Sequence, residues 1–300
     1  MKKIAITFPI FNGLDFTKKC LQRIYDLISE SPSIHDTIRV IITDDGSTDG
    51  SSEWIKNNFP DVILQYGDGN LWWSGGINKA VDYILAHNDI GYMLLWNSDV
   101  IAGDNYFSNL VKISTEIDNN TIILSKVYFL DKPEILISMG GVFNPKNGKY
   151  FLRGYGEKDS NKYSEILPAD WFGGMGTLIH RDILQKVGHF DAVNFPQYHG
   201  DSDFGLRAKK MGIKLFVRPD LKIYNDKTFT GYSNNSSLKV FIRSLYSLKS
   251  NHNIKKEIAF YRKHATSPLA YMQICKHYFR HIGGFIKWKI LNIFGKQRKL

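Results

Sequence analysis

The stretch Leu94-Leu95-Trp96-Asn97-Ser98-Asp99-Val100 decides how the rest of the sequence is interpreted. It begins within an apolar run typical of a short buried strand, and it then turns polar and reaches a carboxylate. In an open α/β sheet, ligands bind outside the carboxyl ends of the strands. Asp99 therefore stands where a carboxylate can hold a divalent cation and, through it, a diphosphate. The alternative is that Asn97 and Asp99 only form a turn before the next helix.

Apolar runs alternate with helical patterns on both sides of this stretch. We expect strands at residues 4–9, 38–43, 62–66 and 92–96, and helices at residues 14–28, 52–58, 74–85 and 107–117. Ser74 is the expected N-cap of the third of these helices. Strands that are almost continuously apolar and that alternate with helices predict an α/β fold with a mainly parallel sheet, covered by helices on both faces.

The pattern changes after residue 118. Short strand-like runs separated by Gly and Pro turns are expected at residues 122–125, 127–130, 135–138 and 149–152. Helices are expected near residues 181–187 and 204–211, and late strands at 214–217 and 221–224. This order predicts a mixed or antiparallel region that closes one side of the sheet.

The composition is that of one large domain, or of one domain with an extension. Two cysteines, Cys20 and Cys275, form neither a disulfide framework nor a metal-ligand spacing, which suits a reducing cytosol. The amino-terminal apolar run ends at Pro9 and predicts a strand, not an export signal. No apolar run of about 18 residues predicts a membrane-spanning helix.

Charge is distributed unevenly along the chain. The net charge is +10, yet residues 236–300 hold 14 Lys and Arg and one acid, Glu257, whereas residues 1–235 hold 25 basic and 28 acidic residues. The carboxy-terminal segment is thus a basic helical extension in which apolar and basic residues are interleaved. Such asymmetry indicates an anionic partner, either a membrane surface or a nucleic acid. Of the two, we expect an anionic membrane surface, on which the segment docks without spanning it, and no nucleic acid.

Three groups of carboxylates stand where strands end or helices begin: Asp44 with Asp45, Asp99, and Asp201 with Asp203. Acids gathered on a body that is otherwise nearly neutral are typical of a diphosphate–cation site. The phosphate-binding loops of P-loop ATPases and of Rossmann dehydrogenases are absent from the sequence, and so is a serine nucleophile elbow. These three enzyme classes are therefore disfavoured.

Six pieces of the chain together resemble the family 2 glycosyltransferases over residues 4–224. They are Thr7-Phe8-Pro9-Ile10-Phe11-Asn12, Thr43-Asp44-Asp45-Gly46-Ser47-Thr48-Asp49-Gly50, Asn70 with Gly75-Gly76-Ile77-Asn78-Lys79-Ala80, Leu95-Trp96-Asn97-Ser98-Asp99, Gly174-Met175-Gly176-Thr177-Leu178-Ile179-His180-Arg181 with Val187-Gly188-His189-Phe190-Asp191, and Tyr198-His199-Gly200-Asp201-Ser202-Asp203-Phe204-Gly205-Leu206-Arg207. The aspartate-rich second piece is the most specific of the six.

The resemblance implies a GT-A fold in residues 1–235, with a nucleotide-binding half at about 1–118, an acceptor half at about 119–235, and the helical extension at 236–300. It implies an inverting hexosyl- or rhamnosyltransferase that uses a UDP- or dTDP-linked sugar. The variant Asn70-Leu71-Trp72-Trp73-Ser74-Gly75-Gly76 is similar to bacterial surface-polysaccharide enzymes. That likeness suggests a glycan or lipid-linked acceptor, and the basic extension predicts a cytoplasmic enzyme that is peripheral on the inner face of the cytoplasmic membrane.

The matched motifs imply a set of nucleotide-sugar-binding residues: Thr7, Pro9, Asn12, Asp44, Asp45, Asn70, Trp73, Gly76, Asn78, Asn97, Ser98 and Asp99. A carboxylate that faces the N–H of a pyrimidine base is chemically sensible for Asp44 and Asp45. The alternative for these two acids is an Asx turn before a helix. Trp73 could stack on a sugar ring or belong to the core.

The family's metal motif ends at Asp99, but its first acid is replaced here by Asn97, and the His that often follows the late strand is replaced by Asn225. With Asp99 and Asn225 as the expected metal ligands, we expect a Mg²⁺ or Mn²⁺ ion that binds weakly without the donor, because the diphosphate brings most of the negative charge.

Asp201 matches the catalytic aspartate of the family, whose preceding Glu is replaced by Gly200. Inversion needs one base that takes the proton of the attacking acceptor hydroxyl, and the alternative is a helix cap. The resemblance also implies an acceptor-side group made of Trp171, Gly174, His199 and Asp203. A lone His is more often structural, and Asp203 could cap the helix.

Two other functions compete with this interpretation. A sugar nucleotidyltransferase has a related fold, but its glycine-rich loop would stand where Pro9-Ile10-Phe11-Asn12 follows the first strand. A non-catalytic membrane or nucleic-acid adaptor would use the basic extension, but it would leave the acidic clusters of the body unexplained.

Overall fold

The computed structural model describes residues 2–226 and 237–293 of the chain. It divides into two compact units. The first, here called the α/β unit, comprises Met1–Val142, Phe151–Pro196 and Gly200–Thr228. The second, here called the C-terminal unit, comprises Phe143–Tyr150, Gln197–His199 and Phe229–Leu300. The domain boundary expected between residues 235 and 236 lies outside the described residues.

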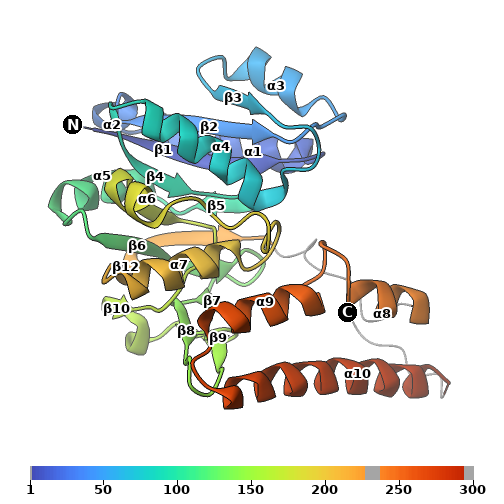
Figure 1. Cartoon of the computed structure of the whole chain (residues 1–300). Coiled ribbons are helices and arrows are strands. Elements are labelled where there is room, and N and C mark those ends of the chain that lie inside the picture. Colours follow the sequence, from blue (N-terminus) through green and yellow to red (C-terminus); the bar gives the residue numbers. More distant parts are fainter. Residues whose placement is uncertain (1, 227–236, 294–300) are drawn as a thin grey trace. The chain divides into compact units, whose positions relative to one another are not determined.

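The α/β unit alternates strands and helices through its first half (Figure 1). The strands are β1 (Lys3–Ile10), β2 (Ile38–Asp44), β3 (Ile63–Tyr66), β4 (Ile90–Leu95), β5 (Val100–Ala102), β6 (Thr121–Phe129), β7 (Leu136–Ser138), β8 (Gly141–Phe143), β9 (Tyr150–Leu152), β10 (Leu167–Pro168), β11 (Thr177–His180) and β12 (Lys214–Asn225). The helices are α1 (Leu14–Ser29), α2 (Pro32–His35), α3 (Ser51–Asn58), α4 (Trp72–Ala86), α5 (Tyr106–Glu116), α6 (Arg181–Val187) and α7 (Gly200–Lys210), with a 3₁₀ turn at Asn161–Tyr163.

The main sheet has the strand order β10-β12-β6-β11-β4-β1-β2-β3, with β5 paired to β12 and β7 paired to β6. Strands β3, β2, β1 and β4 are mutually parallel, and β12 is parallel to β6. Strand β11 is antiparallel to both of its neighbours, β4 and β6. The sheet is therefore mixed, with a parallel half formed by β3, β2, β1 and β4, as the sequence predicts, and an antiparallel strand, β11, beyond β4.

Two hydrophobic cores lie on the two faces of this sheet, because successive strand side chains point to opposite faces. In β1, Ile4 and Ile6 enter the core shared with α1 and α5, whereas Ala5 enters the core shared with α4, α6 and α7. The prediction of an α/β sheet covered on both faces is confirmed.

The late strands are longer than the sequence suggests. The strands expected at 122–125 and 127–130 form one continuous strand, β6, which includes Lys126. Those expected at 214–217 and 221–224 likewise form β12, which includes Pro219. Lys126 is tolerated because its amine donates to Asp159 Oδ1 at 2.7 Å and to the Tyr163 carbonyl at 2.9 Å. Pro219 falls at a register shift between Arg218 and Lys222, where β12 makes no regular ladder bonds to β6.

The prediction that Ser74 caps α4 is wrong. The helix begins at Trp72, and Ser74 is fully buried with its hydroxyl donating to the Phe195 carbonyl at 2.5 Å. The N–H groups of Leu71 and Trp72, at the start of the helix, donate to Asp45, which lies in the connection between β2 and α3.

The C-terminal unit contains the expected helices, α8 (Leu238–Ser244), α9 (Ile254–His264) and α10 (Tyr271–Ile293), with a 3₁₀ turn at Pro268–Ala270. Phe260 of α9 is fully buried and contacts Phe143 and Tyr150 of the same unit, with ring centroids 5.6 and 5.3 Å apart. Helix α10 packs on α8 through the stacking of Phe241 on Phe285 at 4.3 Å.

A polar cluster also holds this unit together. Glu257 accepts a hydrogen bond from His199 at 2.9 Å, and although burial raises the pKa of Glu257, this bond and the nearby histidines outweigh it and leave the pKa below its usual value. Burial lowers the pKa of Lys256 to about 8 and that of His252 to about 4. Over the described residues, no helix is both long and apolar enough to cross a membrane.

Candidate active site

Four of the predicted motifs meet at one edge of the main sheet. Strands β1, β2 and β4 are parallel, so Asn12, Asp45 and Asn97 follow their carboxyl ends at the same edge. Asn225 ends β12, which pairs with Val100 directly after Asp99. The sheet topology therefore gathers residues that are up to about two hundred positions apart in the sequence.

The loops after β1 and β2 are tied to each other by side chains. Asn12 has a φ of 50°, and its side-chain oxygen accepts the Thr48 N–H at 2.8 Å. Asp49 accepts the N–H of Leu14 at 2.9 Å and that of Ser51 at 3.1 Å, thereby joining the starts of α1 and α3. Burial opposes the effect, but these hydrogen bonds and that of the Ser51 hydroxyl hold the pKa of Asp49 below its usual value.

Asp44 and Asp45 are buried, and their carboxylates are used by the fold. Asp44 accepts the Ser47 N–H at 2.8 Å and the Ser52 hydroxyl. Asp45 accepts three backbone N–H groups, from Gly69, Leu71 and Trp72, at 2.9 to 3.2 Å. A local turn before the helix thus describes Asp44, whereas Asp45 holds a distant loop, between β3 and α4. Contact of either acid with a nucleotide stays a prediction.

Trp73 is fixed beside the end of β4. Its indole N–H donates to the Asn97 side-chain oxygen at 3.0 Å, and its ring meets Phe190 edge-on at 5.7 Å. A Cβ added at Gly174 would lie 2.2 Å from the Trp73 ring, so the ring packs directly against the backbone of the Gly174 loop. Neither the indole–amide bond nor this close approach can be seen in local sequence patterns.

Asp201 lies in the first turn of α7, and its carboxylate is held on both oxygens. The Gly174 N–H donates to Oδ2 at 2.9 Å, and the Ser202 N–H donates to Oδ1 at 2.7 Å. Since Gly174 also supports Trp73, a continuous set of contacts runs from Asn97 through Trp73 and Gly174 to Asp201. Figure 1 shows α7 on the same side of the sheet as α4 and α6.

Gly200, which precedes Asp201, is closely surrounded by its neighbours. A Cβ on residue 200 would lie 2.2 Å from the Ser74 hydroxyl and 3.2 Å from the Phe195 carbonyl. The start of α7 is thus packed against α4 too closely for any side chain at this position.

Asp203, the second acid of this turn, has a structural partner. Its side chain is fully buried and accepts from Arg207 Nε at 2.8 Å. The same guanidinium donates to the carbonyls of Val187 and His189, thereby joining α7 to the segment after α6. Asp203 is thus buried in an ion pair with Arg207.

The expected metal ligands lie beside each other. The Asn225 side-chain amide donates to the Asp99 carbonyl at 3.4 Å, and the Asp226 N–H donates to the same oxygen at 3.0 Å. Asp226, which was not among the predicted site residues, is thus a further acid beside Asp99. Asn97, which stands for the first acid of the metal motif, instead accepts from Trp73. Among residues 2–226 and 237–293, no group of three or more His, Cys, Asp or Glu residues could hold a metal ion.

The other predicted nucleotide-side residues have varied surroundings. Thr7 is fully buried, with its hydroxyl 3.5 Å from the Leu94 carbonyl. A Cβ on Gly76 would lie 2.6 Å from Pro9, so α4 passes close to the end of β1. Asn78 exchanges two hydrogen bonds of 2.9 Å with the backbone of Phe190. Asn70 is exposed, and Ser98 is partly exposed in the turn between β4 and β5.

Two acceptor-side predictions fall on residues that pack inside their own units. Trp171 is buried against Gly141, where a Cβ would lie 2.1 Å from its ring. His199 belongs to the C-terminal unit, where its ring bonds Glu257 and stacks on Phe260 at 4.5 Å. These contacts of Trp171 and His199 are packing contacts within the protein. Contact of either residue with an acceptor stays a prediction.

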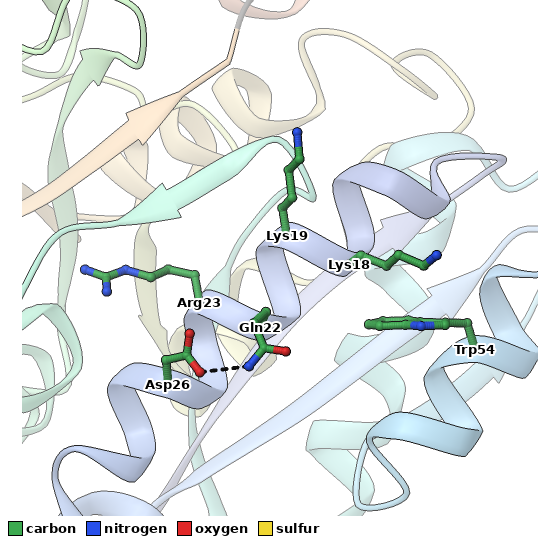
Figure 2. A pocket seen from close by; sticks show the side chains of 6 residues that line it. All are labelled: Lys18, Lys19, Gln22, Arg23, Asp26 and Trp54. Carbon is green, nitrogen blue, oxygen red and sulfur yellow. Dashed lines mark hydrogen bonds between the residues drawn. The ribbon is translucent and has the colours of Figure 1, made fainter.

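A shallow surface depression of about 430 Å³ lies elsewhere on the α/β unit, between α1 and α3 (Figure 2). Lys18, whose amine is 5.6 Å from the Trp54 ring centroid, forms one side of it. Arg23 pairs with Asp104 at 2.5 Å, and Gln22 donates to Asp26 at 2.8 Å. None of these residues belongs to the predicted site, and the paired side chains describe a solvated helix surface.

Two solved structures resemble this chain in fold. One is a crystal structure of GalNAc-T7 with UDP, GalNAc and Mn²⁺, at 12% identity and a TM-score of 0.60. The match covers 93% of this chain and 57% of that one, so the chain spans little more than half of that protein. The other is the mannosyltransferase PcManGT from Pyrobaculum calidifontis with GDP-Man and Mn²⁺, at 15% identity and a TM-score of 0.56, covering 99% of this chain and 76% of that one.

The fold is thus that of the GT-A glycosyltransferases, as the sequence motifs predict. Residues 5–187 match glycosyl transferase family 2, and the chain belongs to this family. No curated protein matches the sequence. Membership of this family favours the glycosyltransferase interpretation over the nucleotidyltransferase and adaptor alternatives.

Proposed function

We propose that this enzyme transfers a hexosyl or rhamnosyl group, with inversion, from a UDP- or dTDP-linked donor to a hydroxyl of a glycan or lipid-linked acceptor in the synthesis of a surface polysaccharide. The observation that carries the proposal is the carboxylate of Asp201, oriented by two backbone N–H groups beside the Trp73–Gly174 contact. A fixed carboxylate at the ligand edge of the sheet suits a general base.

In the proposed reaction, Asp201 takes the proton from the acceptor hydroxyl as its oxygen attacks the anomeric carbon. The new glycosidic bond forms on one face of the sugar, and the bond to the diphosphate breaks on the other, so the nucleoside diphosphate leaves with the electron pair. The Trp73 ring, whose indole N–H donates to Asn97, lies between the end of β4 and the Gly174 loop that contacts Asp201. The sugar would stack against this ring. The rigid backbone contacts of Asp201 keep the base in one orientation.

A Mg²⁺ or Mn²⁺ ion would supply charge neutralisation for the departing diphosphate. Asp99 and Asn225, which the structure brings together, are its proposed protein ligands. Both structural neighbours contain Mn²⁺ with a nucleotide or nucleotide sugar. Because this chain offers few acids at that place, we expect the ion to bind firmly only when the donor's phosphates are present.

The basic carboxy-terminal segment supports a location at the inner face of the cytoplasmic membrane. Residues 236–300 carry a net charge of +13, counted from 14 basic residues and one acid. Each basic residue near an anionic surface contributes about 1 kcal/mol of attraction. A membrane location also suits an acceptor that is linked to a lipid.

Calorimetric titration with UDP, dTDP and GDP, each with and without Mn²⁺, tests the proposed donor class. We expect one site per chain for UDP or dTDP, with tighter binding when Mn²⁺ is present. Preference for GDP would contradict the nucleotide assignment. If none of the three binds with or without Mn²⁺, the proposed donor site itself is wrong.

A further inference from the structure

Helix α10 exposes a row of large apolar side chains. Met272, Phe279, Ile282, Ile286 and Ile290, here called the α10 stripe, are between 42% and 76% exposed. Their spacings of seven, three, four and four residues place them on one face of an α-helix. An exposed apolar row of this length, in contrast to single scattered residues, indicates a docking surface.

The opposite face of α10 is the one that packs within the C-terminal unit. His277 lies 3.1 Å from the ring nitrogen of His252, and His281 stacks on His252 at 3.7 Å and on Phe241 at 4.8 Å. The hydroxyl of Tyr278 donates to the His252 carbonyl at 3.0 Å. These contacts fix the rotation of the helix, so the exposure of the stripe follows from specific packing on the other side.

Cations border the stripe. Lys276, Arg280, Lys287 and Lys289 of α10 are exposed, and the sequence of the helix contains no acid. The amine of Lys289 lies 5.6 Å from the ring of Phe285, beside the stripe. Apolar side chains flanked by Lys and Arg on one helix face are typical of helices that lie in a membrane interface.

The charge pattern favours a bilayer over a second copy of the chain as the occupant. Two stripes packed together would bring the same four cations of each helix close to one another, with no acid on α10 to neutralise them. A bilayer that contains anionic lipids offers both partners that the stripe needs, acyl chains for the apolar row and phosphates for the cations. The helix, roughly 34 Å long at 1.5 Å per residue, would lie along the surface.

We propose that the α10 stripe is the membrane-docking face of this protein, with its apolar row inserted among the lipids of an anionic bilayer and Lys276, Arg280 and Lys287 at the level of the phosphates. This inference deepens the membrane location proposed above and rests on it, but not on the sugar-transfer chemistry.

Flotation with vesicles tests the apolar row. The full chain is mixed with vesicles of phosphatidylglycerol and phosphatidylcholine, or of phosphatidylcholine alone. We expect binding to the anionic vesicles, and the double variant Phe279→Ser/Ile286→Ser lowers the binding constant at least about 10-fold. The matched control is Val193→Ser/Phe151→Ser, which removes two exposed apolar side chains of the α/β unit and leaves binding unchanged.

A second pair of variants tests the cations at equal net charge. Lys276→Gln/Arg280→Gln/Lys287→Gln removes three charges from α10, and Lys112→Gln/Lys132→Gln/Lys158→Gln removes three exposed charges from the α/β unit. At about 1 kcal/mol per engaged residue, we expect the first triple to weaken binding about 100-fold at low salt and the second to have little effect.

Equal flotation of the stripe variant and the wild type would overturn the proposal, and so would a wild type that ignores anionic vesicles. Light scattering identifies the competing occupant: a wild-type dimer that becomes a monomer in the stripe variant, without vesicle binding, assigns the stripe to a second copy. Release of nucleoside diphosphate is measured on the same samples. Flotation as expected with no turnover in the wild type would leave the docking face standing and remove the proposed sugar transfer.

Discussion

Charged residues are used differently at the sheet edge of the α/β unit and on helix α10 of the C-terminal unit. In the α/β unit, Asp44, Asp45 and Asp203 are buried, and their carboxylates are bonded to backbone N–H groups, hydroxyls or Arg207. On α10, Lys276 and Arg280 are exposed on a helix that has no acid. A buried carboxylate with satisfied hydrogen bonds orders the loops around it. An exposed cation without an acid on its own helix is suited to an external anion.

Because the two groups of charges lie on separate elements, catalysis and membrane location should respond to different substitutions. Changes at the ordered carboxylates of the α/β unit should affect turnover, donor binding or folding. Changes on the exposed face of α10 should affect only where the protein is held.

Asp201→Asn should lower turnover by about 100-fold or more, because the amide cannot take the proton of the acceptor hydroxyl. Binding of the nucleoside diphosphate should stay nearly unchanged, since Asn keeps an oxygen that can accept from Gly174. Release of the nucleoside diphosphate measures turnover, and calorimetry measures binding. Near-normal turnover would remove Asp201 from its role.

The neighbouring acid serves as the control for that variant. Asp203→Asn should lower the stability of the fold, because Asp203 is fully buried against Arg207, while turnover per folded molecule stays close to that of the wild type. Urea unfolding and an activity assay on the folded fraction separate the two effects. A 100-fold loss of turnover without a loss of stability would assign the base role to Asp203.

Asp45→Ala should lower the free energy of unfolding by about 2 kcal/mol, because three backbone N–H groups lose their acceptor. Asp68→Ala is the matched control, in the loop between β3 and α4 whose N–H groups donate to Asp45. Asp68 is exposed and accepts the Asn70 N–H at 3.0 Å, so its loss should change stability by less than about 0.5 kcal/mol. Equal urea midpoints for the two variants would show that the Asp45 bonds contribute little.

Asp99→Ala should weaken binding of the nucleoside diphosphate about 10-fold, or about 1.4 kcal/mol, when Mn²⁺ is present. In EDTA the variant and the wild type should bind alike, because the cation is the proposed link between this carboxylate and the phosphates. Calorimetry under both conditions is the measurement. An equal loss in EDTA would indicate a folding defect.

The smallest expected effect concerns pH and the C-terminal unit. Burial, with His281 and His277 nearby, lowers the pKa of His252 to about 4 from an ordinary value near 6.5. The unfolded chain therefore takes up this proton more readily than the folded one. The stabilisation is complete above about pH 6.5 and declines as the pH falls from there toward 4.

Thermal unfolding between pH 7 and pH 5 measures this effect. We expect the midpoint of the wild type to fall more over this interval than that of His252→Gln, which cannot take up the proton. The groups that face His252 and also bear on the result are His277 and His281 of α10 and Glu257 of α9. Identical pH dependence in the two proteins would mean that His252 is not shielded as the packing indicates.

Local patterns in the sequence predict most of the fold of the α/β unit. Helix α6 is predicted with both of its ends, because Gly188, with a φ of 80°, ends it. The start of α4 is not predicted, since its first N–H groups are capped by Asp45, 27 residues before Trp72. The sequence also predicts two short strands where the structure has the single strand β12, because Pro ordinarily ends a strand. Here a register shift between Arg218 and Lys222 accommodates Pro219.

The candidate site is predicted as a list of residues more readily than as an arrangement. Aspartates and glycines at motif spacings identify the loops at the sheet edge. The bond from Trp73 to Asn97 and the packing of Trp73 on Gly174 depend on tertiary contacts between three separate segments. Asp226 was missed because it follows the motif position by one residue, and only the pairing of β12 with β5 brings it to Asp99.

The central claim is that the α/β unit performs the transfer and the α10 stripe holds the enzyme at a bilayer. It is tested most directly by the rate of nucleoside diphosphate release, measured in vesicle-free buffer for Asp201→Asn and for Phe279→Ser/Ile286→Ser. The account predicts a loss of about 100-fold or more in the first variant and a rate within about twofold of the wild type in the second. Equal losses in both, or normal turnover in Asp201→Asn, would contradict it.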